Sequence, residues 1–419
     1  MRKRTRLARA RKAAGFTQEA LAEAMHVDRS TVFRWELGRS EPLPFLRPKL
    51  GRLLGLTREQ LETLLVNEPV APAAAPGRSE VDRRQFLAGT LFSVAASAGS
   101  TQDWLLSTID EVAGAHGKVD SSQIEALRRA FALYQELDVM RGGGHALAQL
   151  TGYLEQVVTP LVNDNGPDST TGRELHSAAG EQFYLLGWMN YDHGNQVGAQ
   201  THLLRALELA RAAKDVALGA HVLAGLSDQA TLTGHPDQGL RLAKTGIAGL
   251  GHDRSPACLA DLRVLQARAE AALGDAEAAD RSISLSQEAF AASEPANEPE
   301  WARFIDAAYL HGEYANAYRD LNRPTETTEH AQVSADEAAR QNRARRGCMA
   351  NAALARAALT SHDLEAASAA GLTALRQAVT VTSSRSAQAV TDLRMRMAPH
   401  RDSPATRQFL DESAVLMPA

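Results

Sequence analysis

The sequence predicts an all-α protein in which a small helical domain precedes a long α-solenoid of helical hairpins. Aromatic residues make up only 5% of the chain and alanine is abundant, which favours closely packed helices over a β-sandwich. From residue 120 onward, helical stretches are joined by short turns, with almost no strand signal. Residues that favour a left-handed turn recur in this part at a nearly constant spacing of 40.

The first 66 residues predict five short helices. Thr17 is placed to N-cap the second helix, and Asp28 to cap the third, which ends at Gly38. A run of leucines marks the fourth helix, and Thr57, with a glutamine three residues later, predicts a capping box for the fifth. We expect Val32 and Trp35 of the third helix to lie in the core of this domain.

Charge is unevenly distributed along the chain. Residues 1–66 contain 14 Lys+Arg and 7 Asp+Glu, a balance of +7, whereas the whole chain carries −5, which leaves −12 for the remainder. A basic N-terminal domain on an acidic body predicts that only the N-terminal domain meets a polyanion.

The N-terminal segment closely resembles the Cro/cI-type (XRE) helix-turn-helix family. Gln18 opens the second helix, the stretch LAEAM leads into the turn, and Trp35-Glu36 with Gly38 closes the third helix. The resemblance implies that residues 29–37 form a recognition helix that enters the major groove of DNA.

The same resemblance assigns roles to individual positions. It implies base reading by Arg29, Ser30, Thr31 and Arg34. It implies phosphate contacts by Gln18, Thr17 and Arg39. It also implies an ion pair between Arg11 and Glu36 that ties the first helix to the third.

The two arginines of the recognition helix also make physical sense as readers of guanine. They lie five residues apart, within about 140° on one helical face, and arginine binds guanine O6 and N7 bidentately for roughly 1–3 kcal/mol per base pair. The alternative is that they form part of a solvated face. Phe33 either contacts a thymine methyl group or packs, and Arg2, Lys3, Arg4 and Arg6 are either an arm on phosphates or a loose tail.

The segment from 67 to 104 predicts a Pro/Ala-rich linker and a connecting helix. Within it, residues 82–98 imitate a twin-arginine export signal, since Arg83-Arg84 precede an apolar run that ends on small residues. We interpret this stretch as a helix that joins the linker to the body, because such signals are N-terminal and cleavage here would sever the DNA-binding domain. The expected location is therefore the cytoplasm, with a membrane-tethered regulator as the remaining alternative.

The body, residues 105–400, resembles a degenerate tetratricopeptide-type array. Its predicted hairpin turns fall at Gly194, Gly234, Gly274, Asn322 and His362. The motif spacing is kept by Gly187, Ala199 and Ala206, while later repeats lose the glycine, so the broader description is a tetratricopeptide-like solenoid. A further hairpin, with Arg141-Gly142-Gly143-Gly144 as its turn, is expected to start the array, and residues 401–419 are expected to form a tail.

One position in each repeat predicts a stripe along the concave side of the solenoid. Six residues before the turn positions lie Trp188, Asp228, Arg268, Asn316 and Arg356, with Tyr184 one helical turn from the first. One hypothesis is a groove for a peptide or small ligand, in which Arg268 and Arg356 hold an anionic group. The other is a polar inner surface with internal ion pairs.

Motifs for catalysis or metal binding do not occur in the sequence. It has no Walker loop, no dinucleotide-binding glycine motif, no nucleophile elbow and no metal-ligand spacing among its histidines. The two cysteines, Cys258 and Cys348, stand alone, and no apolar run has the roughly 18 residues that a membrane span requires. We therefore expect a protein that is not an enzyme and binds no metal, cofactor or membrane.

The combination of these two parts resembles bacterial helix-turn-helix regulators with tetratricopeptide-like sensor domains, among them the peptide-sensing regulators of Gram-positive bacteria. The resemblance implies a transcriptional regulator that binds double-stranded DNA as a homodimer, under the control of a peptide or small-molecule effector. The alternative is a scaffold in which the solenoid recruits a partner protein to DNA without a ligand.

Overall fold

The structure is a computed structural model in which the all-α fold class is confirmed. It describes residues 7, 10–11, 14, 16–25, 29–36, 47–54, 56, 119–251 and 255–417. The chain divides into two compact units, residues 1–85 and 86–419, each described separately below. The predicted fifth helix of the N-terminal unit, Arg39 and the stretch 82–98 lie outside the described residues.

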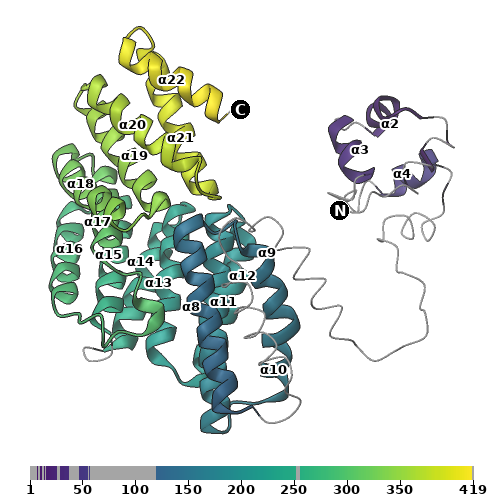
Figure 1. Ribbon diagram of the computed structural model, residues 1–419, viewed down its shortest axis with the longest axis vertical. Coiled ribbons are helices and arrows are strands. Elements are labelled where there is room, and N and C mark those ends of the chain that lie inside the picture. Colours follow the sequence, from purple (N-terminus) through teal and green to yellow (C-terminus); the bar gives the residue numbers. More distant parts are fainter. Residues whose placement is uncertain are drawn as a thin grey trace. The chain divides into compact units, whose positions relative to one another are not determined.

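Three helices of the N-terminal unit are described (Figure 1). They are α2 (Gln18–Met25), α3 (Arg29–Glu36) and α4 (Arg47–Leu54). The hydroxyl of Thr17 accepts a hydrogen bond from the Ala20 amide at 3.1 Å, which caps α2 as its sequence predicts. Helices of eight residues are not stable alone. They are held by a shared apolar core to which Leu7, Leu21, Met25, Val32, Trp35, Leu50 and Leu54 contribute.

The second unit is a succession of antiparallel helices, coloured from blue to yellow in Figure 1. Its first helices are α8 (Ser121–Arg141), α9 (Leu147–Tyr153), a π-helical turn (Leu154–Val158) and α10 (Thr159–Asp164). Five hairpins follow: α11 (Thr170–Asp192) with α12 (Gln196–Ala213), α13 (Val216–Leu232) with α14 (Pro236–Leu250), α15 (Pro256–Ala272) with α16 (Ala276–Ala291), α17 (Ala307–Asp320) with α18 (Pro324–Arg340), and α19 (Ala344–Thr360) with α20 (Leu364–Ala378). The last helices are α21 (Ser384–Met397) and α22 (Pro404–Leu416).

The hairpin turns have the backbone conformation that their spacing predicts. The five expected turn positions all have positive φ: Gly194 at 87°, Gly234 at 87°, Gly274 at 80°, Asn322 at 57° and His362 at 59°. Asparagine and histidine are among the side chains that tolerate the left-handed region best, so they can replace glycine in the last two turns. The longer step between the third and fourth turns accommodates residues 292–306, which include a short 3-10 helix (Glu300–Ala302).

Small residues allow the first hairpin to close tightly. A Cβ atom on Gly187 of α11 would lie 2.9 Å from Cγ of Leu203 on α12, closer than real contacts of this kind. Ala199 and Ala206 of α12 are fully buried in the same crossing, as expected from their spacing.

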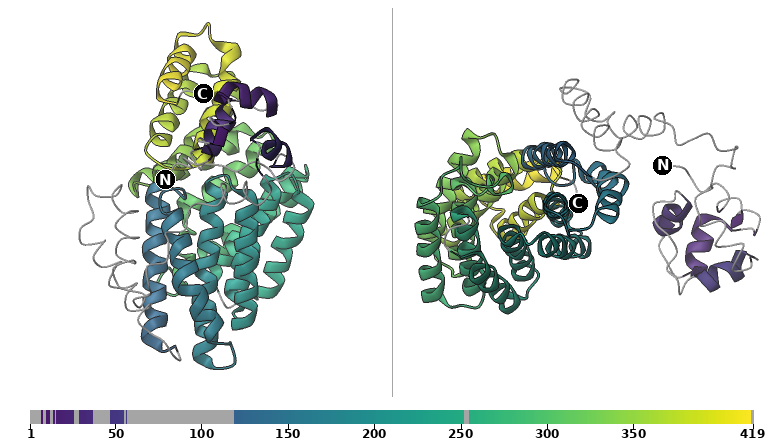
Figure 2. Two further views of the ribbon diagram at one scale, coloured as in Figure 1. Left: turned by 90° about the vertical axis from the view of Figure 1, so that its right-hand side faces the viewer. Right: turned by 90° about the horizontal axis from the view of Figure 1, so that it is seen from below.

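The hairpins wind around a common axis until the last ones meet the first, as the right-hand view in Figure 2 shows. At the meeting point Arg345 of α19 donates to both carboxylate oxygens of Asp138 on α8, at 3.0 and 2.7 Å. Its guanidinium also lies 3.0 Å from the carboxylate of Asp192 at the end of α11. The Ser383 hydroxyl donates to Asp192 at 2.8 Å. We call Asp138, Asp192, Arg345 and Ser383 the closure contact.

The glycine run after α8 is required by this closure. Gly142 has φ of 88°, and a Cβ atom there would lie 2.7 Å from the backbone oxygen of Thr382. The segment after α8 and the segment around Thr382 are joined by two backbone hydrogen bonds. The Thr382 amide donates to the Arg141 carbonyl at 2.8 Å, and the Gly144 amide donates to the Thr382 carbonyl at 3.0 Å. A side chain at Gly142 would hold these segments apart.

The predicted C-terminal tail contains a packed helix. Helix α22 lies against α20 and α21 and buries Phe409 completely beside Gly371, where a Cβ atom would approach the ring to 3.1 Å. Thr406, Phe409 and Ser413 form its buried face with helical spacing, so the amphipathic signal was present in the sequence.

Candidate DNA-binding and effector sites

The orientation of α3 in the N-terminal unit is fixed by a buried polar cluster. The Arg11 side chain donates from Nε to Glu36 Oε1 at 2.6 Å and to the Phe16 carbonyl at 2.6 Å. Gln18 at the start of α2 donates its amide to Glu36 Oε2, also at 2.6 Å. The carboxylate at the end of α3 therefore ties this helix both to Arg11 and to α2, and charge-assisted hydrogen bonds of this kind are the stronger ones.

Within the solenoid, an inner network of ionic groups connects four hairpins. Arg268 of α15 lies 3.5 Å from Asp228 of α13 and 2.5 Å from Glu313 of α17. Glu313 also pairs with Arg346 at 3.1 Å and accepts from Asn316 at 3.1 Å. We call these five residues the inner network. Only 2% of Arg268 is exposed, so the network is internal.

Two carboxyl groups, one in the inner network and one beside it, have pKa values shifted in opposite directions. Although burial alone would raise it, the guanidiniums of Arg268 and Arg346 hold the pKa of Glu313 at about 2. Asp261 lies nearby without a guanidinium at hydrogen-bonding distance, and burial raises its pKa to about 7, against a hydrogen bond from the Tyr309 hydroxyl at 2.8 Å.

The raised pKa of Asp261 makes stability depend on pH. Between about pH 4 and pH 7 the folded chain retains a proton that the unfolded chain has released, so the free energy of unfolding decreases as the pH rises through this window. Asp261→Asn keeps an acceptor for Tyr309 and carries no charge. Relative to the parent, this variant should therefore gain stability from pH 4 to pH 8, by up to ~4 kcal/mol for a shift of about three pKa units.

Urea denaturation at pH 4, 6 and 8 measures this gain. Asp411→Asn, at an exposed position of α22, is the matched control and should change stability equally at each pH. An Asp261→Asn variant that gains nothing between pH 4 and pH 8 would show that this carboxyl group is charged in the folded chain.

The six residues predicted to line one ligand groove occupy four places. Asp228, Arg268 and Asn316 meet in the inner network. Tyr184 packs against His221 with ring centroids 3.9 Å apart. Trp188 lies below the guanidinium of Arg385, which is 5.5 Å from its ring centroid and 4.8 Å from that of Tyr191. Arg356 lines a separate cavity described below.

The sequence reasoning missed the partners that hold these groups. The residues of the stripe lie six positions before a hairpin turn, and Glu313, Arg346 and Arg385 do not. Two of these partners come from the last helices of the ring, Arg346 from α19 and Arg385 from α21. Glu313 lies one helical turn before Asn316, a position that a search of neighbouring turns on the same face could have found.

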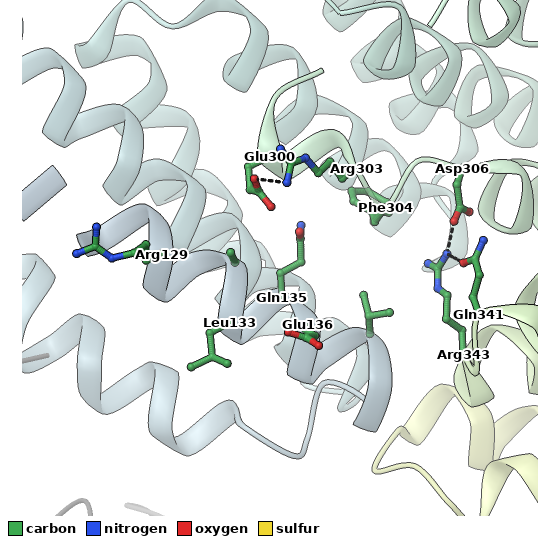
Figure 3. A pocket seen from close by; sticks show the side chains of 12 residues that line it. Arg129, Leu133, Gln135, Glu136, Glu300, Arg303, Phe304, Asp306, Gln341 and Arg343 are labelled. Carbon is green, nitrogen blue, oxygen red and sulfur yellow. Dashed lines mark hydrogen bonds and ion pairs between the residues drawn. The ribbon is translucent and has the colours of Figure 1, made fainter. Parts of the chain in front are cut away.

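A larger cavity of about 580 Å³ lies beside the closure contact (Figure 3). Its side chains come from α8, from the segment 300–306 and from the turn before α19: Arg129, Ala132, Leu133, Gln135, Glu136, Val139, Glu300, Arg303, Phe304, Asp306, Gln341 and Arg343. We call it the α8 pocket. Apolar groups such as Leu133 and Phe304 lie among charged ones, and the Arg343 guanidinium is 2.6 Å from Asp306.

The α8 pocket is in contact with the inner network. Phe304 packs edge-on against Tyr309, with ring centroids 5.2 Å apart. The guanidinium of Arg346, a member of the inner network, lies over the ring of Tyr309, 4.8 Å from its centroid. A ligand in the pocket would therefore contact Phe304, which reaches the inner network through Tyr309, and Val139, which follows Asp138 of the closure contact in the chain.

Comparison with known proteins identifies the N-terminal segment. Residues 7–61 match the profile of the helix-turn-helix family HTH_3. This segment is a helix-turn-helix domain. Such domains place the second helix of the motif in the major groove, and the protein is accordingly a DNA-binding transcriptional regulator. No curated protein has a sequence that matches this chain.

One solved structure similar to the chain is that of Bacillus thuringiensis PlcR in complex with the peptide PapR7 and DNA. The sequences are 14% identical, the match covers 69% of this chain and 94% of that chain, and the TM-score is 0.32. At that identity and TM-score, the likeness carries no conclusion about this chain.

Within the helix-turn-helix domain, α3 occupies the place of the recognition helix. Positions 29, 30, 31 and 34 all belong to it, although their side chains lie outside the described part of the structure. Phe33 of the same helix is 47% exposed and does not contribute to the core. Thr17 is exposed and Gln18 half-buried, both at the N-terminus of α2.

The described residues contain neither a membrane-spanning helix nor a metal site. No helix among them is long and apolar enough to cross a membrane. Over the same residues, no group of three or more His, Cys, Asp and Glu side chains is arranged to hold a metal ion.

Proposed function

We propose that this regulator binds a two-fold symmetric operator as a homodimer, and that a peptide or small ligand bound by the solenoid controls its affinity. The observation that carries the DNA-binding half is the recognition helix α3, held by Arg11, Glu36 and Gln18. Base contacts come from Arg29, Ser30, Thr31 and Arg34. Phosphate contacts come from Thr17, Arg39 and the second amide hydrogen of Gln18, which remains after its bond to Glu36.

Dimerisation follows from the size of the reading domain. One helix-turn-helix domain reaches one half-site, and linking two of them raises affinity through effective concentration. The solenoid supplies the dimer contacts.

The α8 pocket is the proposed effector site. A volume of about 580 Å³ suits a short peptide or a small molecule, and apolar groups beside a few charged ones are typical of ligand sites. Because the pocket is lined from α8 on one side of the closure and from the turn before α19 on the other, a bound ligand would favour the closed ring over any opened form. Such a difference in affinity between two states is what couples a ligand to DNA binding.

The inner network is the second candidate for effector contact. Asp228 Oδ1 and Arg268 Nε have no hydrogen-bond partner among the described residues. A peptide group offers one donor and one acceptor, which would satisfy both atoms. Since both residues are buried, a ligand would reach them only if the ring opened.

Selection of genomic fragments by the purified full-length protein tests the DNA-binding half. An enriched palindrome with half-sites one helical turn apart, or a multiple of it, is expected for a dimer. If no sequence is enriched, specific DNA binding is rejected.

The effector half is tested by screening short synthetic peptides and metabolites for stabilisation of the protein. A true effector should change the operator Kd by about 5- to 150-fold. The change should disappear in Leu133→Arg, which fills the α8 pocket, and persist in Leu285→Arg, an exposed leucine on α16 outside it. Ligands that bind without changing the Kd would instead favour the scaffold, in which the solenoid recruits a partner protein.

A further inference from the structure

A second cavity of the solenoid, of about 340 Å³, is lined by positively charged groups. It lies between the α17–α18 turn, the end of α19 and the end of α21. The lining residues are Arg319, Asn322, Arg323, Pro324, Thr327, Arg356, Ala357, Leu359, Thr360, Arg396 and His400. Four arginines and a histidine thus line this cavity, and none of its lining residues is acidic. We call it the arginine cavity.

The carboxylates that pair with these arginines lie outside the lining. Arg319 lies 2.7 Å from Asp320, and Arg323 contacts Asp280 at 2.8 Å as well as Glu326. These partners neutralise part of the charge, but the lining itself contains no carboxylate for the remaining N–H groups, of which each guanidinium has five.

Arg356 is the least satisfied of the four. Its one ionic partner among the described residues is Asp392, at 3.5 Å, and no hydrogen bond from its guanidinium is formed there. Asp392 is already bound to Nε of Arg396 at 2.8 Å, so two guanidiniums share a single carboxylate. Burial, together with the charges of Arg319 and Arg396, lowers the pKa of Arg356 against the opposing charges of Asp392 and Asp320.

The backbone adds to this positive potential. Helix α18 has 17 residues and begins in the cavity wall, with Arg323 as its N-cap and Pro324 in its first turn. The N-cap side chain makes no capping hydrogen bond, and the carboxylate of Glu326 in the first turn accepts a backbone amide, so the positive end of the dipole is only partly offset at this wall of the cavity.

We propose that the arginine cavity binds a small molecule through a phosphate group. Planar guanidiniums match phosphate oxygens in bidentate geometry, and a dianion would satisfy both Arg356 and Arg396, which now share one carboxylate. The volume is at the lower end of the range for small-molecule sites, so it fits one phosphorylated group better than a stretch of duplex DNA.

The cavity is connected to the inner network through a single side chain. Arg319 donates to Asn316 Oδ1 at 2.6 Å, and Asn316 in turn donates to Glu313. A phosphate that draws Arg319 toward the cavity competes with this bond, which links phosphate binding to the interior of the ring.

Titration calorimetry and thermal unfolding of the full-length protein test the proposal. The probes are inorganic phosphate, pyrophosphate and adenosine monophosphate, with sodium chloride at equal ionic strength as the reference. We expect the phosphates to raise the Tm with concentration, as ligands of the native state do. Tighter binding of adenosine monophosphate supports a phosphoester as the ligand, and binding of inorganic phosphate alone supports the free ion.

Variants of the cavity arginines decide the location. Arg356→Ala with Arg396→Ala should weaken binding of these phosphates at least tenfold, while Arg376→Ala, which removes an exposed arginine of α20, should leave it unchanged. If the double variant does not fold, Arg396→Gln alone decides, because that side chain is 48% exposed. Three results would each overturn the proposal. The phosphates bind no better than the chloride reference, the variants bind them as tightly as the parent, or the variants lose affinity for the operator while they still bind phosphate.

Discussion

Replacing Arg29 and Arg34 with alanine should abolish the ability of the protein to select its operator. Each arginine on the recognition helix α3 can bind a guanine bidentately, and each such pair contributes about 1–3 kcal/mol of discrimination against other bases. Both subunits of the proposed dimer would lose these contacts at once. We expect specific affinity in the double variant to fall to the level of nonspecific binding, measured as the enrichment and the Kd of operator over random DNA at fixed salt.

The matched control removes the same charge from a different place. Arg2→Ala with Arg4→Ala also deletes two arginines, from the start of the chain, where the alternatives are an arm on phosphates and a loose tail. Under either alternative this control keeps the sequence preference. If the segment is a phosphate-binding arm, its loss would lower both the affinity and the salt dependence of binding. A doubly substituted Arg29 and Arg34 protein that still selects the parent operator would rule out α3 as the reading helix.

The position of α3 makes this test specific for base reading. Val32 and Trp35 hold the helix by their burial, and Glu36 holds its end through Arg11 and Gln18. None of these groups is changed in the double variant, so circular dichroism should show the parent's helical content.

Much of the fold could be predicted from the sequence because it is repetitive. A residue in the left-handed conformation ends the first helix of each hairpin, and this local requirement is visible as Gly, Asn or His every 40 residues, with one longer step between Gly274 and Asn322. Positions at a constant offset from these turns fall on the same side of the solenoid. Asp228, Arg268 and Asn316 therefore meet in the structure through Glu313, as consecutive repeats on one side predict.

The remaining features depend on contacts that no repeat spacing reveals. The ring closes because Arg345 meets Asp138, which lies 207 residues earlier in the chain. Nothing local to either residue indicates that pairing. Gln18 illustrates the same limit on a smaller scale: its place in the motif implies a phosphate contact, while one hydrogen of its amide is used for Glu36, 18 residues further along.

Replacing Arg345 with alanine should destabilise the solenoid by about 3–5 kcal/mol, the usual cost of removing one partner from a buried ion pair. Asp138 and Asp192 are buried, and Arg345 is the cation at hydrogen-bonding distance from both. Burial raises the pKa of Asp138, whereas that of Asp192 is lowered, because the charges of Arg345 and Arg385 and the hydrogen bonds of Gly143 and Ser383 outweigh burial. Without the guanidinium, two neighbouring carboxylates would face each other inside the protein.

Because the loss of stability in Arg345→Ala comes from repulsion between two carboxylates, it should depend on pH. The pKa values of Asp138 and Asp192 should both rise in Arg345→Ala, so protonation relieves the repulsion, and the loss in free energy of unfolding should be smaller at pH 5 than at pH 8. Arg340→Ala, which removes a 66% exposed arginine from an i,i+3 pair on α18, should cost less than about 1 kcal/mol at either pH. Urea denaturation at both pH values compares the two variants. An equal loss at pH 5 and pH 8 would assign the effect of Arg345 to packing, and a loss no larger than that of Arg340→Ala would show that the ring is held closed by other contacts.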